Sequence, residues 1–280
     1  MAALQMSEMN IDQGPADATD RRIALLIDAD NISHAKIAAI LAELSKYGTA
    51  NIRRAYGDWT NPCLKGWRDK LHDFAIRPIQ QFSYSTGKNA TDIALVIDAM
   101  ELLYTQKLGA FCIASSDADY TPLVMQLKAN GHEVYGFGER KTPGPFVNAC
   151  TTFLYVDTLG DPATGDAVVQ ATPNASQANV EAGGSGSKGG ALPPSTQDET
   201  LVAALRGGVE AAAREDGWAL LSNAANAAKR QAPIDPRNYG AKNFTALFEA
   251  TGLFEMFRVE GGHPYVADRR NKDRAHRPAV

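Results

Sequence analysis

Two apolar stretches of the sequence, residues 23–27 and 110–114, run directly into polar and acidic side chains. Apolar runs without alternation are typical of parallel strands that are covered on both faces, and ligands bind beyond the carboxyl ends of such strands. We therefore expect the carboxylates at these positions to share one edge of a sheet. The aspartates that follow the two stretches are Asp28, Asp30, Asp117 and Asp119.

A fifth carboxylate, Asp92, lies near the start of a predicted helix between the two stretches. Carboxylates that converge without a basic partner repel one another, and hard divalent cations with oxygen ligands relieve that repulsion. The pattern therefore predicts a Mg²⁺ or Mn²⁺ ion, which could activate water for an in-line displacement at a phosphodiester. His and Cys residues in this region do not have the spacing of zinc ligands.

Each aspartate taken alone could equally be a turn residue or a helix cap. Their joint occurrence favours a site. Asp98 lies six positions after Asp92, a spacing that does not return to the same face of a helix. We expect Asp98 to pair with a nearby backbone or basic group, and a direct role in the site is the alternative.

Two glycine-containing segments fail as nucleotide-binding motifs. The segment Gly87-Lys88-Asn89 lacks both the earlier glycine and the Ser or Thr of a phosphate loop, and residues 136–141 lack the third glycine of a dinucleotide fingerprint. Lys88 stays of interest as a phosphate contact near Asp92, against the alternative that it is a solvated loop lysine.

The elements that must position these residues alternate between strand and helix. Strands are expected at residues 22–28, 51–56, 75–82, 110–114 and 133–137, with a possible sixth at 153–156, and helices follow each of the first four. This alternation predicts an α/β fold, a Rossmann-like three-layer sandwich around a mainly parallel sheet.

The composition divides the chain into five segments. A Gly-, Ser- and Ala-rich stretch at residues 160–196 predicts a flexible linker that lets two domains sample many orientations. Three helical patterns followed by a hairpin beyond it predict a small winged-helix module. The segments are a disordered leader at 1–19, an α/β domain at 20–159, the linker at 160–196, a winged-helix domain at 197–268 and a basic tail at 269–280.

The formal net charge of −4 provides no global basic field, so any surface that binds nucleic acid must be a local patch. We expect a basic and aromatic rim on the loops around the acidic edge. Neither a signal peptide nor a membrane-spanning apolar run is recognisable, which favours a cytoplasmic protein. The residues expected in the rim are Lys65, Trp67, Arg68, Lys88, Arg140 and Lys141.

The segments 26–31, 88–98 and 115–120 together resemble the NYN domain family of PIN-like ribonucleases, over residues 21 to 159. The resemblance implies a metal-dependent nuclease in which Asp28, Asp92 and Asp117 are catalytic. Ser116 departs from the glycine of many members, which removes no carboxylate. The resemblance further implies metal ligands at Asp28, Asp92, Asp117 and Asp119, with Asn31, Ser115 and Ser116 as neighbours that orient the substrate.

The C-terminal segments 217–221, 235–240 and 244–249 resemble the OST-HTH, or LOTUS, domain, a winged-helix fold associated with RNA and with protein partners. The paired resemblances imply a ribonuclease with a tethered module that binds RNA or a protein; the oligomeric state is left open. One alternative is an RNA-binding regulator that does not cleave. Another is a phosphatase or nucleotide hydrolase that uses Asp28 as a covalent nucleophile.

Overall fold

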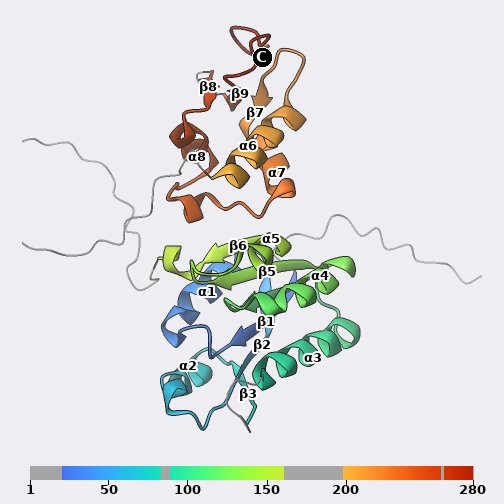
Figure 1. The fold of residues 1–280 in the computed structure, drawn as a ribbon, viewed down its shortest axis with the longest axis vertical. Helices are drawn as coiled ribbons and strands as arrows, with labels where there is room; N and C mark the ends of the chain where they lie inside the picture. Colours follow the sequence, from blue (N-terminus) through green and yellow to red (C-terminus); the bar gives the residue numbers. More distant parts are fainter. Residues whose placement is uncertain (1–20, 83–88, 161–197, 260–261, 280) are drawn as a thin grey trace, which may run out of the picture.

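A computed structural model describes residues 21–82, 89–160, 198–259 and 262–279. The predicted leader, Lys88 and nearly all of the predicted linker lie outside these ranges. The N-terminal unit is the predicted α/β sandwich: six parallel strands are arranged in the order β3-β2-β1-β4-β5-β6 (Figure 1). The strands are β1 (Arg22–Asp28), β2 (Thr49–Gly57), β3 (Arg77–Gln80), β4 (Ala110–Ala114), β5 (Glu133–Gly138) and β6 (Thr152–Tyr155).

Strand β1 lies in the middle of the sheet because its side chains are apolar on both faces. All residues from Ile23 to Ile27 are fully buried, and the strand pairs in parallel with β2 on one side and with β4 on the other. Since every pairing in this sheet is parallel, the carboxyl ends of the strands share one edge. Asp28 and the residues after β4 therefore meet at that edge, as the sequence predicts.

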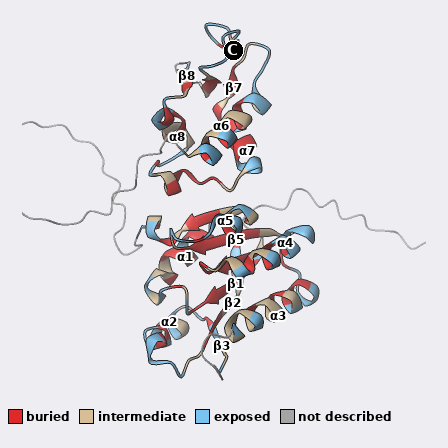
Figure 2. Cartoon of the chain, in the orientation of Figure 1, coloured by how far each residue is buried: buried red, intermediate tan, exposed pale blue. Residues whose placement is uncertain are grey.

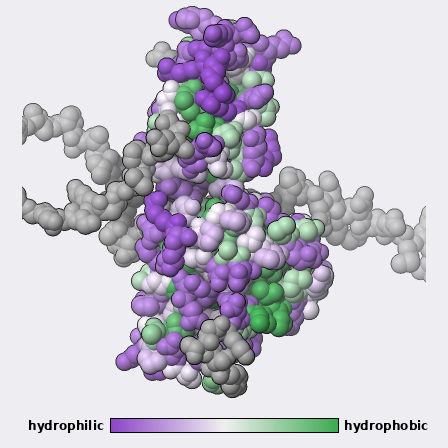
Figure 3. Space-filling model, viewed as in Figure 1, coloured by the Kyte–Doolittle hydropathy of each residue, from purple (hydrophilic) through white to green (hydrophobic). Residues whose placement is uncertain are grey.

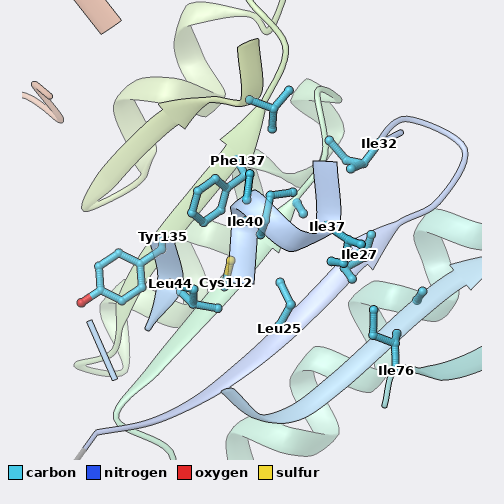
Figure 4. Close-up of a cluster of buried hydrophobic side chains, with 14 of the residues drawn as sticks. Leu25, Ile27, Ile32, Ile37, Ile40, Leu44, Ile76, Cys112, Tyr135 and Phe137 are labelled. Carbon is cyan, nitrogen blue, oxygen red and sulfur yellow. The ribbon is translucent and has the colours of Figure 1, made fainter. Parts of the chain in front are cut away.

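Helices cover both faces of the sheet (Figures 1 and 2). On one face, α1 (Ile37–Leu44) packs Ile37, Ile40 and Leu44 against residues of β1 and β5, as Figure 4 shows. On the other face, α3 (Ala90–Thr105), α4 (Thr121–Ala129) and α5 (Gly144–Ala149) bury a second cluster that contains Leu26 and Phe111. The short helix α2 (Trp67–Asp73) lies beside the edge strand β3. Helix α5 has no counterpart among the predicted elements.

The C-terminal unit has the predicted three helices and hairpin. Helices α6 (Glu199–Ala212), α7 (Leu221–Gln231) and α8 (Phe244–Thr251) share a core with strands β8 (Phe254–Arg258) and β9 (Pro264–Asp268). The sequence did not indicate β7 (Ala219–Leu220), which pairs with β9 and completes a three-stranded sheet in the order β7-β9-β8. None of the helices in the described ranges has the length and apolar character needed to cross a bilayer.

The two units contact each other at the β6 edge of the large sheet (Figure 1). Asn238 of the C-terminal unit donates a hydrogen bond to the backbone oxygen of Phe153 (2.8 Å), and Arg237 forms a salt bridge with Glu43 of α1 (2.6 Å). In this orientation the two units make direct contacts, and the many orientations predicted from the linker composition stay a prediction.

Replacing the fully buried Leu25 by Ala should lower the free energy of unfolding by about 3 kcal/mol, because it leaves a cavity in the centre of the sheet. The control is Ile97→Ala on the solvent side of α3, where Figure 3 shows a hydrophobic surface patch and Ile97 is 62% exposed. It should change stability by less than about 0.5 kcal/mol. Urea denaturation measures both values, and a similar small loss for Leu25→Ala would contradict the central placement of β1.

Candidate functional site

Asp28 is the buried centre of the acidic edge. It is the last residue of β1, and only 1% of its surface is exposed. Its Oδ2 accepts hydrogen bonds from the Asn31 side chain (2.6 Å) and from the Ser115 hydroxyl (2.9 Å). Its Oδ1 accepts one bond, from the backbone N–H of Asp30 at 3.2 Å. One carboxylate oxygen is therefore fixed by two side chains, and the other carries a single long bond.

Ser115 joins the end of β1 to the turn after β4. Its hydroxyl oxygen also accepts a hydrogen bond from the backbone N–H of Asp117 (3.1 Å), and the Asp117 carboxylate accepts one from the backbone N–H of Asp119 (2.9 Å). Asp117 is thus both a turn cap and a member of the edge. Ser115 is fully buried, and its hydroxyl positions Asp28; the substrate-orienting role predicted for it stays a prediction.

Asp92 reaches the same edge from the first turn of α3. Its Oδ1 accepts a hydrogen bond from the hydroxyl of Tyr120, which is a fully buried residue (2.7 Å). Two long contacts connect the neighbouring residues, from Asn89 to Asp119 (3.4 Å) and from Thr91 to Asp30 (3.5 Å). The three sequence segments that carry the aspartates therefore meet in space. The sequence analysis gave no role to Tyr120, although it directly follows Asp119.

Asp98 does not belong to this group. It pairs with Arg54 and accepts a hydrogen bond from the Tyr56 hydroxyl, both from β2. The expectation that Asp98 has a basic partner is confirmed. Burial, together with the hydrogen bond to Asp98, raises the pKa of Tyr56 and keeps its hydroxyl a donor.

The electrostatics of the edge favour the uptake of positive charge. Burial raises the pKa of Asp28 to about 6; the hydrogen bonds from Asn31 and Ser115 lower it, and the charges of Asp92 and Asp30 raise it. Burial also raises the pKa of Asp30, with Asp92 adding to the effect. The carboxylates therefore destabilise one another's charged forms, which a bound cation would reverse.

The arrangement suits a hydrated ion better than a closed cage. In the described ranges, no three or more His, Cys, Asp or Glu side chains lie close enough together to hold a metal ion. Mg²⁺ keeps several waters and uses one or two carboxylates plus phosphate oxygens of the substrate, so it does not require such a cage. The oxygen donors and the mutual repulsion of Asp28 and Asp92 fit an ion of this kind.

A cavity of about 900 Å³ lies between α2 and the edge strand β3, beside the end of β2. Trp59 forms part of its wall, and its indole N–H donates to the backbone oxygen of Ile79 (3.1 Å). Asp58, the residue before Trp59, is close enough to Asp30 to raise its pKa. The cavity therefore opens near the acidic edge. Its lining combines apolar, aromatic and basic residues, including Trp59, Pro62, Leu64, Lys65, Arg68 and His72.

The predicted rim residues fall into separate places. Lys65 and Arg68 are exposed and line the cavity. Trp67 is wrong as a rim residue: it is 2% exposed and packs in the core, because its apolar ring covers the sheet, and Trp59 lies at the cavity instead. Lys88 lies outside the described residues.

The loop after β5 carries the remaining predicted cations. Arg140 lies over the ring of Tyr155 at 5.8 Å, and Lys141 pairs with Glu139 at 2.9 Å. Ser116 holds this loop, since its hydroxyl accepts a hydrogen bond from the backbone N–H of Glu139 (2.8 Å). Ser116 therefore links the acidic edge to this loop, and the substrate-orienting role predicted for it stays a prediction.

Two family models match the chain, the NYN domain at residues 22–157 and the OST-HTH/LOTUS domain at residues 193–266. The chain carries an NYN domain followed by an OST-HTH/LOTUS domain. An NYN domain has a nuclease-type fold, and an OST-HTH/LOTUS domain implies RNA binding. The acidic edge described above lies within the NYN domain, and Asn238 and Arg237 belong to the OST-HTH/LOTUS domain.

Individual relatives add little about activity. The chain is 28% identical over 123 residues to the uncharacterized protein MJ0482 of Methanocaldococcus jannaschii, a match that covers 42% of this chain and 48% of that protein. The chain thus spans about half the length of that relative.

Among solved structures, a protein of unknown function, VPA0982 from Vibrio parahaemolyticus, has a TM-score of 0.43 at 16% identity, over 50% of this chain and 96% of the other. The WlbA dehydrogenase from Bordetella pertussis has a TM-score of 0.26 at 15% identity, over 44% of this chain and 28% of the other. Neither likeness carries an argument about the NYN domain.

The buried carboxylate of Asp28 should make the stability of the metal-free protein pH-dependent. Its folded pKa of about 6 lies above the ordinary value of 3.8, so the folded state holds a proton that the unfolded state releases. This contribution is fully present below about pH 4 and is lost as the pH rises through 6, by up to about 3 kcal/mol.

Chemical denaturation in chelator at pH 4 to 8 measures this loss as the difference between wild type and Asp28→Asn, in which position 28 no longer titrates. Between pH 4 and pH 7 the free energy of unfolding of the wild type should fall relative to that of Asp28→Asn. A difference that stays constant across the range would show that Asp28 has an ordinary pKa.

Proposed function

We propose that the protein is a divalent-metal-dependent ribonuclease that hydrolyses RNA phosphodiester bonds at the acidic edge of its NYN domain. The observation that carries the proposal is the meeting of Asp28, Asp92 and Asp117 from three separate segments, with Asp28 buried and its charge opposed by Asp92. Burying a charge that hydrogen bonds offset only in part is costly, so the presence of Asp28 at the sheet edge supports a functional site.

Neighbouring side chains orient the carboxylates of Asp28 and Asp92. Asn31 and Ser115 fix Oδ2 of Asp28, which leaves Oδ1 directed away from these two donors. Tyr120 donates to Oδ1 of Asp92, so Oδ2 would be the oxygen that takes a ligand. An ion bound by these oxygens would lower the pKa of a water molecule and neutralise charge on the phosphate. The ordered carboxylates would then place the water and the phosphate in line.

The cavity at Trp59 offers a route for the RNA. Single-stranded RNA is bound by stacking of its bases on aromatic rings and by basic groups that contact its phosphates. Trp59 provides a ring whose indole N–H is bonded to the backbone oxygen of Ile79, and Lys65 and Arg68 supply cations in the same cavity. A nucleotide next to the scissile phosphate would occupy this cavity, with the phosphate toward Asp30.

A second candidate is an RNA-binding regulator without cleavage activity. It is favoured by the absence, in the part of the chain that the structure describes, of a group of three or more candidate metal ligands. A phosphatase with Asp28 as the attacking nucleophile is disfavoured, because this carboxylate is 1% exposed and its Oδ2 is already bound by two side chains.

The direct experiment incubates labelled single-stranded and structured RNAs with the full chain in Mg²⁺, in Mn²⁺ and in chelator. Cleavage should require the ion, and Asp28→Asn and Asp117→Asn should each lower the rate by at least about 100-fold, because each removes a carboxylate charge that the ion needs. Glu101→Gln, an exposed acid on α3, is the matched control and should retain full activity. Binding of RNA without cleavage under every condition would instead support the regulator.

Arg68→Ala should weaken RNA binding without changing the maximal rate, because it removes a phosphate contact in the cavity and none of the carboxylates of the acidic edge. The slope of log affinity against log salt should decrease by about 0.7, the value for one neutralised phosphate on a single strand. Fluorescence anisotropy at several salt concentrations measures the slope. The control Lys107→Ala, an exposed lysine before β4, should leave it unchanged, and equal slopes for Arg68→Ala and wild type would remove the cavity from the RNA route.

A further inference from the structure

The turn 235–240 of the OST-HTH/LOTUS domain contacts the NYN domain in a way that the proposed active site does not use. It begins at Asp235, whose carboxylate caps the short helix Pro236–Tyr239, and it ends at Gly240 with a left-handed φ of 74°. Only glycine adopts such a φ without strain. The turn therefore has a capped start and a glycine end, and it carries Arg237 and Asn238 at its centre.

Asn238 completes the edge of the large sheet. Its Nδ2 donates to the backbone oxygen of Phe153 (2.8 Å), and its Oδ1 accepts from the backbone N–H of Tyr155 (3.2 Å). A residue of a parallel neighbouring strand would bond to the same two groups, so the carboxamide takes the place of one strand residue. Asn238 is 9% exposed, so these hydrogen bonds are shielded from water.

Arg237, next to Asn238, adds a charged contact between the two domains. Its Nη1 and Nη2 donate to the two carboxylate oxygens of Glu43 on α1, at 2.6 and 2.8 Å. Its Nη2 and Nε also donate to the carboxylate of Asp235, at 2.8 and 2.9 Å. Burial alone would raise the pKa of Glu43, but the hydrogen bonds from Arg237 and Lys46 outweigh it and lower the pKa. A bidentate pair of this kind fixes orientation as well as distance.

The resulting orientation brings cations of both domains to one cleft. A cleft of about 410 Å³ lies along the seam and is lined by three cations, Lys128 of the NYN domain and Lys229 and Arg230 of the OST-HTH/LOTUS domain. Tyr47 and Asn148 also line it, as does Glu133, whose carboxylate pairs with Arg21. Polar and aromatic walls with three cations suit a ribose-phosphate backbone. The cleft exists only while the two domains stay in this orientation.

We propose that the Asp235–Asn238 turn is a latch that locks the OST-HTH/LOTUS domain onto β6 and α1, so that cations of both domains form one cleft for the backbone of single-stranded RNA. The proposal takes RNA as the ligand but does not depend on its cleavage. It also goes beyond a loose tether, in which each domain would bind RNA independently.

Distance measurement between two spin labels tests the latch in the full chain. Cys63 is exposed whereas Cys112 and Cys150 are buried, so one native cysteine of the NYN domain accepts a label. Glu249→Cys on the exposed side of α8 supplies the second label position. A latched chain gives one narrow distance distribution, and a broad distribution in this otherwise unmodified chain would overturn the proposal.

Two variants, one in each domain, remove contacts of the latch. Asn238→Ala removes the strand mimic, and Glu43→Gln removes the charge that faces Arg237 without altering the turn. Both should broaden the distance distribution while the circular dichroism spectrum stays native. Asn226→Ala, the same substitution at an exposed position of α7, is the control and should stay narrow. Narrow distributions in both latch variants would overturn the proposal, even if one of them were to disturb local folding.

Binding of a labelled single-stranded RNA in chelator tests the cleft separately from cleavage. Asn238→Ala should bind at least about fivefold more weakly than Asn226→Ala, because the cations no longer act together. Equal affinities would remove the cleft from the proposal. Loss of cleavage activity in the wild type would leave this comparison intact, so failure of the nuclease assignment and failure of the latch are distinguishable.

Discussion

The structure depends on the placement of one buried carboxylate, Asp28, at the end of the central strand. The apolar run before it fixes β1 in the middle of the sheet, which forces the side chain into a site of 1% exposure. Two hydrogen bonds from Asn31 and Ser115 offset part of the cost of burying its charge, and the charge of Asp92 adds to that cost. The parallel topology therefore brings carboxylates together that repel one another, and a bound cation would relieve that repulsion.

The two domains meet on the side of the sheet opposite the Trp59 cavity. In the strand order, β3 with the cavity is one outer strand and β6 with Asn238 is the other. The aspartates lie at the carboxyl ends of the central strands β1 and β4, between these two. The seam cleft, in contrast, is lined by Glu133 and Thr152, the first residues of β5 and β6, at the amino ends of the strands.

The parallel sheet, the winged-helix unit and the meeting of the aspartates were predictable because buried strands give continuous apolar runs and parallel strands end at one edge. Features set by contacts distant in sequence were not. Trp67 shares a helical face with Leu64 and Leu71, a spacing that indicates burial, whereas nothing local places Trp59 at a cavity. Arg237 and Glu43 are 194 positions apart, so their pairing leaves no local pattern. Helix α5, between Pro143 and Cys150, is short and contains a proline, and its periodicity is correspondingly weak.

The central claim is that Asp28 makes the edge of the NYN domain a cation site. Calorimetric titration of Mn²⁺ into chelator-treated, RNA-free protein tests it most directly, with wild type, Asp28→Asn and the control Glu101→Gln compared at one pH. The account predicts saturable uptake by wild type and by the control, and at least about tenfold weaker uptake by Asp28→Asn. Binding by Asp28→Asn that equals binding by wild type would contradict it.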